Sequence, residues 1–70
     1  MKMTTDQVLS KALESQLKGD FAQADIYYSA ILSNNPFHPD ANFRMGTLAL
    51  QLGKTANASS YFIKAIDAAP

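Results

Sequence analysis

Few side chains in this sequence could do acid–base or nucleophilic chemistry, and their spacing does not assemble a site. His38 is the only histidine and Glu14 the only glutamate, while cysteine is absent. The serines have no histidine at helical spacing, and no glycine-rich nucleotide motif occurs. We therefore expect a protein that is not an enzyme, with no catalytic residue, no metal ligand and no cofactor. We interpret His38 as an exposed residue of a connecting segment.

The side chains that recur at regular spacing are apolar, and their period is that of a helix. In the first segment Val8, Leu9, Ala12, Leu13 and Leu17 follow the i, i+3, i+4 pattern of one helix face. The same reasoning predicts four helices, over about residues 6–18, 21–33, 40–52 and 55–68. No segment alternates with period two over a useful length, so we predict no strand.

Local signals mark the ends of these helices. Thr4 followed by Gln7 is a capping box, and Asp20 can cap the second helix. Gly19 and Gly53 stand where the first and third helices should end. Two prolines forbid a continuous helix through the connector of residues 34–39, which separates the second and third helices.

The chain contains an internal repeat, in which residue types recur about 34 residues apart, a period that indicates stacked helical units. Small residues recur where antiparallel helices approach closely, an aromatic residue recurs one turn later, and glycine and proline recur at the ends. The pairs are Gly19 and Gly53, Ala12 and Gly46, Ala24 and Ala58, Tyr28 and Phe62, and Pro36 and Pro70. Each repeat should be a helical hairpin that buries its apolar face by stacking on a neighbour.

With this period, the sequence resembles the tetratricopeptide repeat family. The second repeat reads Asn42-x2-Met45-Gly46-x2-Ala49, Ala58-x3-Phe62 and Pro70, and the first reads Val8-x2-Lys11-Ala12-x2-Ser15, Ala24-x3-Tyr28 and Pro36. The resemblance implies an all-α fold of two stacked antiparallel helix-turn-helix hairpins, a short α-solenoid with a right-handed superhelical tendency. It divides the chain into a tail at 1–4, a repeat at 5–38 and a repeat at 39–70 without a capping helix.

The resemblance also implies a protein-binding groove lined by the first helix of each repeat. The positions are Asp6, Leu9, Leu13, Gln16 and Leu17 in the first repeat, and Asp40, Phe43, Arg44, Thr47, Leu50 and Gln51 in the second. Three interpretations of the leucines remain open: they are core, they form a groove for an apolar peptide or helix, or they mediate self-association.

The fourth helix should expose the face that a following repeat would cover. The residues on it are Tyr61, Phe62, Ala65 and Ile66. Leaving such side chains in water forfeits roughly 1.5–3 kcal/mol each. We therefore predict either a homo-oligomer formed through this face or a structural, scaffolding fragment of a longer protein, for instance one that precedes a catalytic domain.

The charge balance and hydropathy of the sequence limit the classes of partner and the cellular location that we expect. Lys plus Arg and Asp plus Glu number six each, which argues against nucleic acid or a membrane surface. No secretion signal or apolar span is evident, so we expect a cytoplasmic protein. The leading hypothesis is a protein–protein interaction module that binds a protein or peptide partner through its apolar groove and stacking surfaces.

Overall fold

The computed structural model describes residues 3–68, and they form four α-helices. These are α1 (Thr5–Leu17), α2 (Phe21–Asn34), α3 (Pro39–Gln51) and α4 (Thr55–Ala68). The prediction of an all-α fold is confirmed, and each predicted helix end lies within one residue of the observed one. Pro70, predicted to close the fourth helix, and the first residues of the predicted tail lie outside the described residues.

The predicted caps of the first two helices are present. The Thr4 hydroxyl accepts from the Gln7 N–H at 3.1 Å, and the Gln7 side chain accepts from the Thr4 N–H at 2.8 Å, which completes the capping box. The Asp20 carboxylate accepts from the Gln23 N–H at 3.2 Å. Each contact satisfies a backbone donor that has no partner within the helix.

The interpretation of His38 as an exposed connector residue is wrong. Its side chain is half-buried, and Nδ1 accepts from the Ala41 N–H at 3.1 Å, so His38 is the N-cap of α3. Pro39 follows at the first helical position, where its missing N–H costs nothing. Asn42 holds the connector in place, because its amide donates to the carbonyls of Pro36 and His38.

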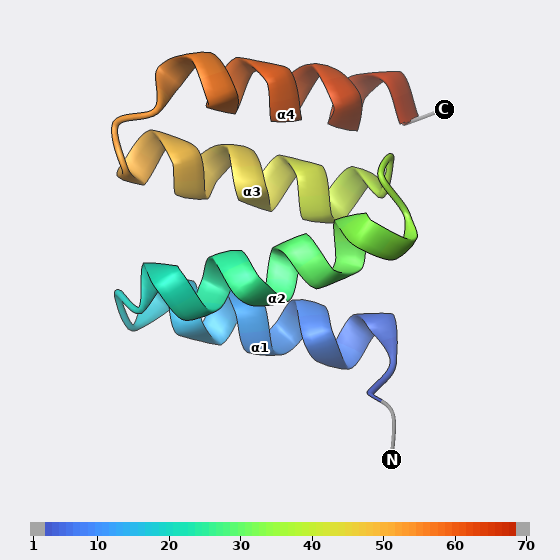
Figure 1. Cartoon of the computed structure of the whole chain (residues 1–70), viewed down its shortest axis with the longest axis vertical. Coiled ribbons are helices and arrows are strands. Elements are labelled where there is room, and N and C mark those ends of the chain that lie inside the picture. Colours follow the sequence, from blue (N-terminus) through green and yellow to red (C-terminus); the bar gives the residue numbers. More distant parts are fainter. Residues whose placement is uncertain (1–2, 69–70) are drawn as a thin grey trace.

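Two glycines make the tight turns inside the hairpins, as predicted. Gly19 has φ 83° and Gly53 has φ 76°, a left-handed conformation that other residues adopt only with strain. The turn from α1 to α2 and the turn from α3 to α4 are therefore both short, and each pair of helices packs antiparallel (Figure 1).

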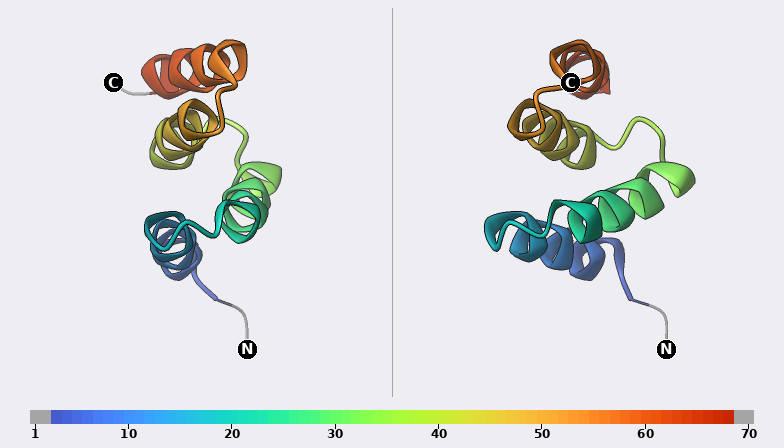
Figure 2. Two further views of the ribbon diagram at one scale, coloured as in Figure 1. Left: turned by 90° about the vertical axis from the view of Figure 1, so that its left-hand side faces the viewer. Right: turned by 60° about the vertical axis from the view of Figure 1, so that its left-hand side comes forward.

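The two hairpins stack so that α2 and α3 are the middle helices, with α1 and α4 on the outside (Figure 1). Within residues 3–68, α3 packs against α1, α2 and α4, whereas α4 packs against α3 alone. Views along the helices show α3 between α4 and the first hairpin (Figure 2). The fourth helix thus has one neighbour where the third has three.

The core lies between the hairpins. Ala12, Ala24, Tyr28, Met45 and Leu48 form one buried cluster drawn from α1, α2 and α3. The small side chains at 12 and 24 let α1 and α2 approach closely, as the repeat predicted. Among the described residues, no helix is long and apolar enough to cross a membrane.

Candidate protein-binding site

The first hairpin presents a face that the second hairpin covers. We call it the covered face, and it consists of Leu9, Gln16, Tyr28 and Leu32. Tyr28 is completely buried and Gln16 is 8% exposed, while Leu9 and Leu32 are half-buried against the core cluster. The helix that covers this face is α3, through Met45 and Leu48.

A polar network joins α1, α2 and α3 inside the covered face. The Tyr28 hydroxyl donates to Gln16 Oε1 at 2.7 Å. The Gln16 amide nitrogen donates to Thr47 Oγ1 at 3.1 Å and to Gln51 Oε1 at 2.7 Å. Every polar group of the Gln16 side chain therefore has a partner, and two of the partners belong to α3. The network ties α3 to one register on the first hairpin, because a shifted helix would leave buried polar groups unpaired.

Charges near this network are few. The Arg44 Nε lies 3.7 Å from an Asp40 carboxylate oxygen, an ion pair along α3. Burial raises the pKa of the Tyr28 hydroxyl above its ordinary value of 10, against a smaller opposite effect of the Arg44 guanidinium. The hydroxyl thus keeps its proton and serves as a hydrogen-bond donor.

The second hairpin has a face at the equivalent repeat positions, but nothing within residues 3–68 lies over this face. We call it the uncovered face, and it consists of Phe43, Leu50, Phe62 and Ile66, which are the repeat equivalents of the four residues of the covered face. Phe43 is 52% exposed and Ile66 is 71% exposed, and Leu50 is exposed as well. All four positions are more exposed than their counterparts in the first hairpin.

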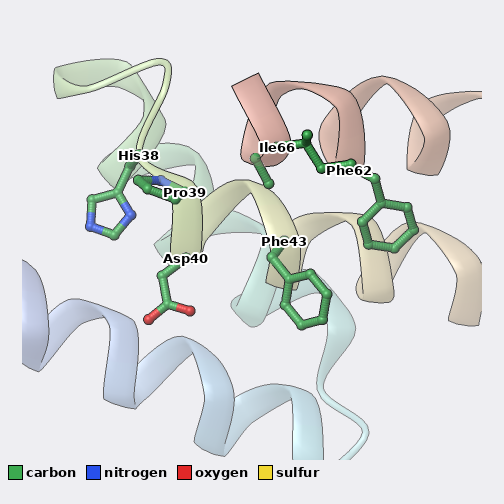
Figure 3. Close-up of a pocket in the computed structure, with 7 residues that line it drawn as sticks. His38, Pro39, Asp40, Phe43, Phe62 and Ile66 are labelled. Atoms are coloured by element: carbon green, nitrogen blue, oxygen red, sulfur yellow. The ribbon is translucent and has the colours of Figure 1, made fainter. Parts of the chain in front are cut away.

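A cleft of about 740 Å³ opens at one end of the uncovered face. Phe43 and Phe62 stand side by side in it, with ring centroids 5.8 Å apart, and Ile66 comes from the next turn of α4 (Figure 3). The residues that line the cleft are His38, Pro39, Asp40, Phe43, Phe62, Ala65 and Ile66. The floor is apolar, and Asp40 supplies the only carboxylate among the lining residues, so the cleft suits an apolar side chain or helix.

Gly46 determines how deep Phe62 sits. A Cβ placed on this buried glycine would lie 2.5 Å from Phe62 Cε1, well inside van der Waals contact. Because Gly46 has no side chain, the Phe62 ring can pack directly against α3. In the first hairpin Ala12 occupies the equivalent position, so the two aromatic rings meet different neighbours.

The outer side of α1 has the opposite character. α3 buries Ala41, Met45 and Leu48, but the equivalent positions of the first repeat are polar. They are Gln7, Lys11 and Glu14, all exposed, and we call them the outer face of α1. Glu14 forms an ion pair with Lys18 at 3.0 Å, and this contact lowers the pKa of its carboxyl. A polar surface of this kind is not suited to lie over another hairpin's apolar face.

The residues predicted for a groove do not share one environment. Leu9 and Gln16 belong to the covered face and Phe43 and Leu50 to the uncovered face, while Leu13, Arg44 and Thr47 are half-buried. Leu17 is 79% exposed at the end of α1. Of the predicted self-association residues, Phe62, Ala65 and Ile66 line the cleft, whereas Tyr61 packs against the core cluster.

Sequence reasoning missed the polar network and the outer face of α1. Both could have been found by comparing each position with its equivalent in the other repeat, since Gln16 and Tyr28 become Leu50 and Phe62. The described residues contain no group of three or more histidine or acidic side chains that could hold a metal ion.

Comparison with known proteins adds one finding. Residues 39–70, which contain α3 and α4, match a family model described as tetratricopeptide repeat. No curated protein and no solved structure matches the chain.

Proposed function

We propose that the chain binds a partner protein through its uncovered face. Residues 39–70 match the tetratricopeptide repeat family, whose repeats generally mediate protein–protein interaction. The observation that supports this function is the contrast between two faces of the same chain. Positions that α3 covers on the first hairpin are open on the second, and all four of them there are apolar.

The occupant that fits this face is an amphipathic helix. On the covered face the occupant is itself a helix, α3, which buries Ala41, Met45 and Leu48 at the i, i+4, i+7 spacing of one helix side. The uncovered face repeats the same framework of two antiparallel helices. Helix-in-groove docking uses this kind of spacing for its apolar anchors.

A titration tests the proposal. The protein is labelled with 15N and titrated with a cross-linked helical peptide that carries leucines at i, i+4 and i+7. We expect amide shifts concentrated around Phe43, Leu50, Phe62 and Ile66. Ile66→Glu should abolish binding, because it places a charge in the apolar contact. Shifts centred on α2, or no shifts up to millimolar peptide, would refute the proposal.

A matched control separates specific binding from non-specific hydrophobic association. Ile26 lies on α2 away from the uncovered face and is 61% exposed, similar to Ile66. Ile26→Glu adds the same charge at a similarly exposed position, so it should leave peptide binding unchanged. Both substitutions are at exposed sites and should leave the circular dichroism spectrum as it is.

Self-association through the same face is the second candidate. It is favoured by the amount of apolar surface on so small a domain, with Phe43, Leu50, Ile63 and Ile66 all exposed. The outer face of α1 is polar, so head-to-tail stacking is disfavoured and a two-fold pairing of uncovered faces remains. Sedimentation across a concentration series should then show a dimer that Phe62→Glu dissociates. A monomer mass at every concentration would eliminate this candidate.

A further inference from the structure

His38, at the junction of the two hairpins, is a residue whose charge can change near neutral pH. It is the only histidine of the chain, and the ordinary titration of a histidine falls between about pH 5 and 8. Its ring is half-buried at the start of α3 and stands at one end of the cleft (Figure 3). A change of charge at this place acts on α3, the helix that packs against the other three.

The contact that caps α3 exists only while the His38 ring is neutral. The Ala41 N–H can only donate, so Nδ1, which lies 3.1 Å from the Ala41 nitrogen, must accept with its lone pair. The neutral ring therefore carries its proton on Nε2. In the charged ring both nitrogens carry protons, and Nδ1 becomes a second donor that faces the Ala41 N–H. Protonation thus removes the cap of the helix.

The surroundings of the ring do not offset this loss. A positive charge at the N-cap lies against the positive end of the α3 dipole. Asp40 is the one titratable side chain that lines the cleft with His38, and it pairs with Arg44 at 3.7 Å, so these two charges largely cancel at the ring. The cleft residues from α4 are apolar. On its other side His38 shares a small hollow with residues of the N-terminal segment, α1, α2 and the connector, and none of the hollow's lining residues is titratable.

The remaining contacts of the connector do not titrate. The Asn42 amide donates to the carbonyls of Pro36 and His38 at 3.0 and 3.1 Å. The Asn42 N–H donates to the same His38 carbonyl at 3.0 Å, and the His38 N–H donates to the Asn35 carbonyl at 3.0 Å. Loss of the cap therefore loosens the first turn of α3 without releasing the connector.

We propose that His38 is a pH-sensitive cap, which holds the first turn of α3 at neutral pH and releases it when the ring is protonated. His38, Pro39 and Asp40 all line the cleft, so the turn that loosens in acid forms one end of that cleft. The unfolded chain has no cap to lose and takes up the proton more readily than the folded protein. By linkage, the stabilisation is complete above the histidine range and is lost as pH falls through it. The cap acts whatever occupies the uncovered face.

Stability in mild acid tests the proposal. Urea denaturation followed by circular dichroism gives the folding equilibrium constant at about pH 7.5 and about pH 5.5, where carboxylates keep their charge. In the native protein this constant should fall roughly fivefold in acid, the loss typical of a missing N-cap. No change with pH would overturn the proposal.

Two variants assign the pH dependence to the ring. His38→Asn supplies an amide oxygen that accepts at this position at either pH, so its folding equilibrium constant should not change. His38→Ala has no acceptor, so it should be equally insensitive to pH and less stable than His38→Asn throughout. Each protein is compared with itself at the two pH values, which removes differences in packing. An equal fall in the native protein and in His38→Asn would overturn the proposal.

Nuclear magnetic resonance locates the effect in the molecule. At neutral pH the ring of the 15N-labelled native protein should carry its proton on Nε2, with Nδ1 unprotonated. On acidification the Ala41 amide proton should shift upfield in step with protonation of the ring. The Gln23 amide, which the Asp20 carboxylate caps on α2, is the matched control and should not move. A neutral ring protonated on Nδ1, or an Ala41 resonance that stays in place, would overturn the proposal.

Discussion

The two hairpins of this protein share one repeat register but differ in what lies on them. In the first, Tyr28 is completely buried and hydrogen-bonded, and in the second, Phe62 at the same position is only partly buried and lines a cleft. Polar groups occur on the face that has a partner within the chain, and only apolar side chains on the face that has none among the described residues. The neighbour, and not the repeat position alone, therefore determines which residues form core and which stay exposed.

The largest effect should come from removing the aromatic ring on each face in turn. Tyr28→Ala opens a cavity in the central core and should cost about 3–5 kcal/mol of unfolding free energy. Phe62→Ala removes a ring that is only half-buried, so we expect about 1–2 kcal/mol. Urea denaturation followed by circular dichroism measures both. Equal losses would show that the two faces are energetically alike and would contradict the comparison.

A smaller effect should come from the residue beneath the Phe62 ring. Gly46→Ala adds a Cβ that overlaps this ring, and the ring must then move outward into the cleft. We expect a destabilised protein in the native background. In a Phe62→Ala background the overlap is gone, and the same substitution should stabilise α3 by about 1 kcal/mol, the helix propensity of alanine over glycine. A double-mutant cycle measures whether the effect of Gly46→Ala on the free energy of unfolding changes sign between the two backgrounds. Additive effects of the two substitutions would show that Gly46 and the Phe62 ring are not coupled.

Much of the fold could be predicted from the sequence because its signals are local. The capping box at Thr4 and Gln7, the cap at Asp20 and the turns at Gly19 and Gly53 each depend on residues a few positions apart. The cap of α3 was not predicted, because histidine is not among the residues that usually cap helices. Its role at His38 follows from the placement of the connector, which Asn42 fixes from within α3.

The candidate site was predicted less well, because burial depends on contacts between distant residues. The groove stripe included Gln16 and Leu50 as equivalent positions, yet one is buried in a polar network and the other exposed. Tyr61 and Phe62 are adjacent in sequence but have different surroundings, since one packs against the core cluster and the other lines the cleft. Helical spacing alone gives the angle between two side chains and does not show which of them has a neighbour.

The smallest effect we expect concerns the proton on Tyr28. Burial raises the pKa of this hydroxyl in the folded protein above its ordinary value of 10. The unfolded chain therefore loses this proton first as pH rises, and the free energy of unfolding falls above pH 10. The full stabilisation is present below the unfolded pKa, and the slope stays below about 1.4 kcal/mol per pH unit, the limit for one proton.

Two variants isolate this effect from the lysines, which lose their charge in the same range. Tyr28→Phe removes the ionisable group from the covered face, so its stability should fall less steeply than that of the native protein above pH 10. Phe62→Tyr places a hydroxyl at the same repeat position on the uncovered face, where water can solvate the phenolate. This added hydroxyl should not make the free energy of unfolding fall more steeply with pH, because a group with the same pKa in the folded and unfolded states does not link folding to pH. Denaturant titrations at several alkaline pH values measure the free energy of unfolding of all three proteins. If this free energy falls equally steeply with pH in the native protein and in Tyr28→Phe, the buried hydroxyl does not distinguish the two faces.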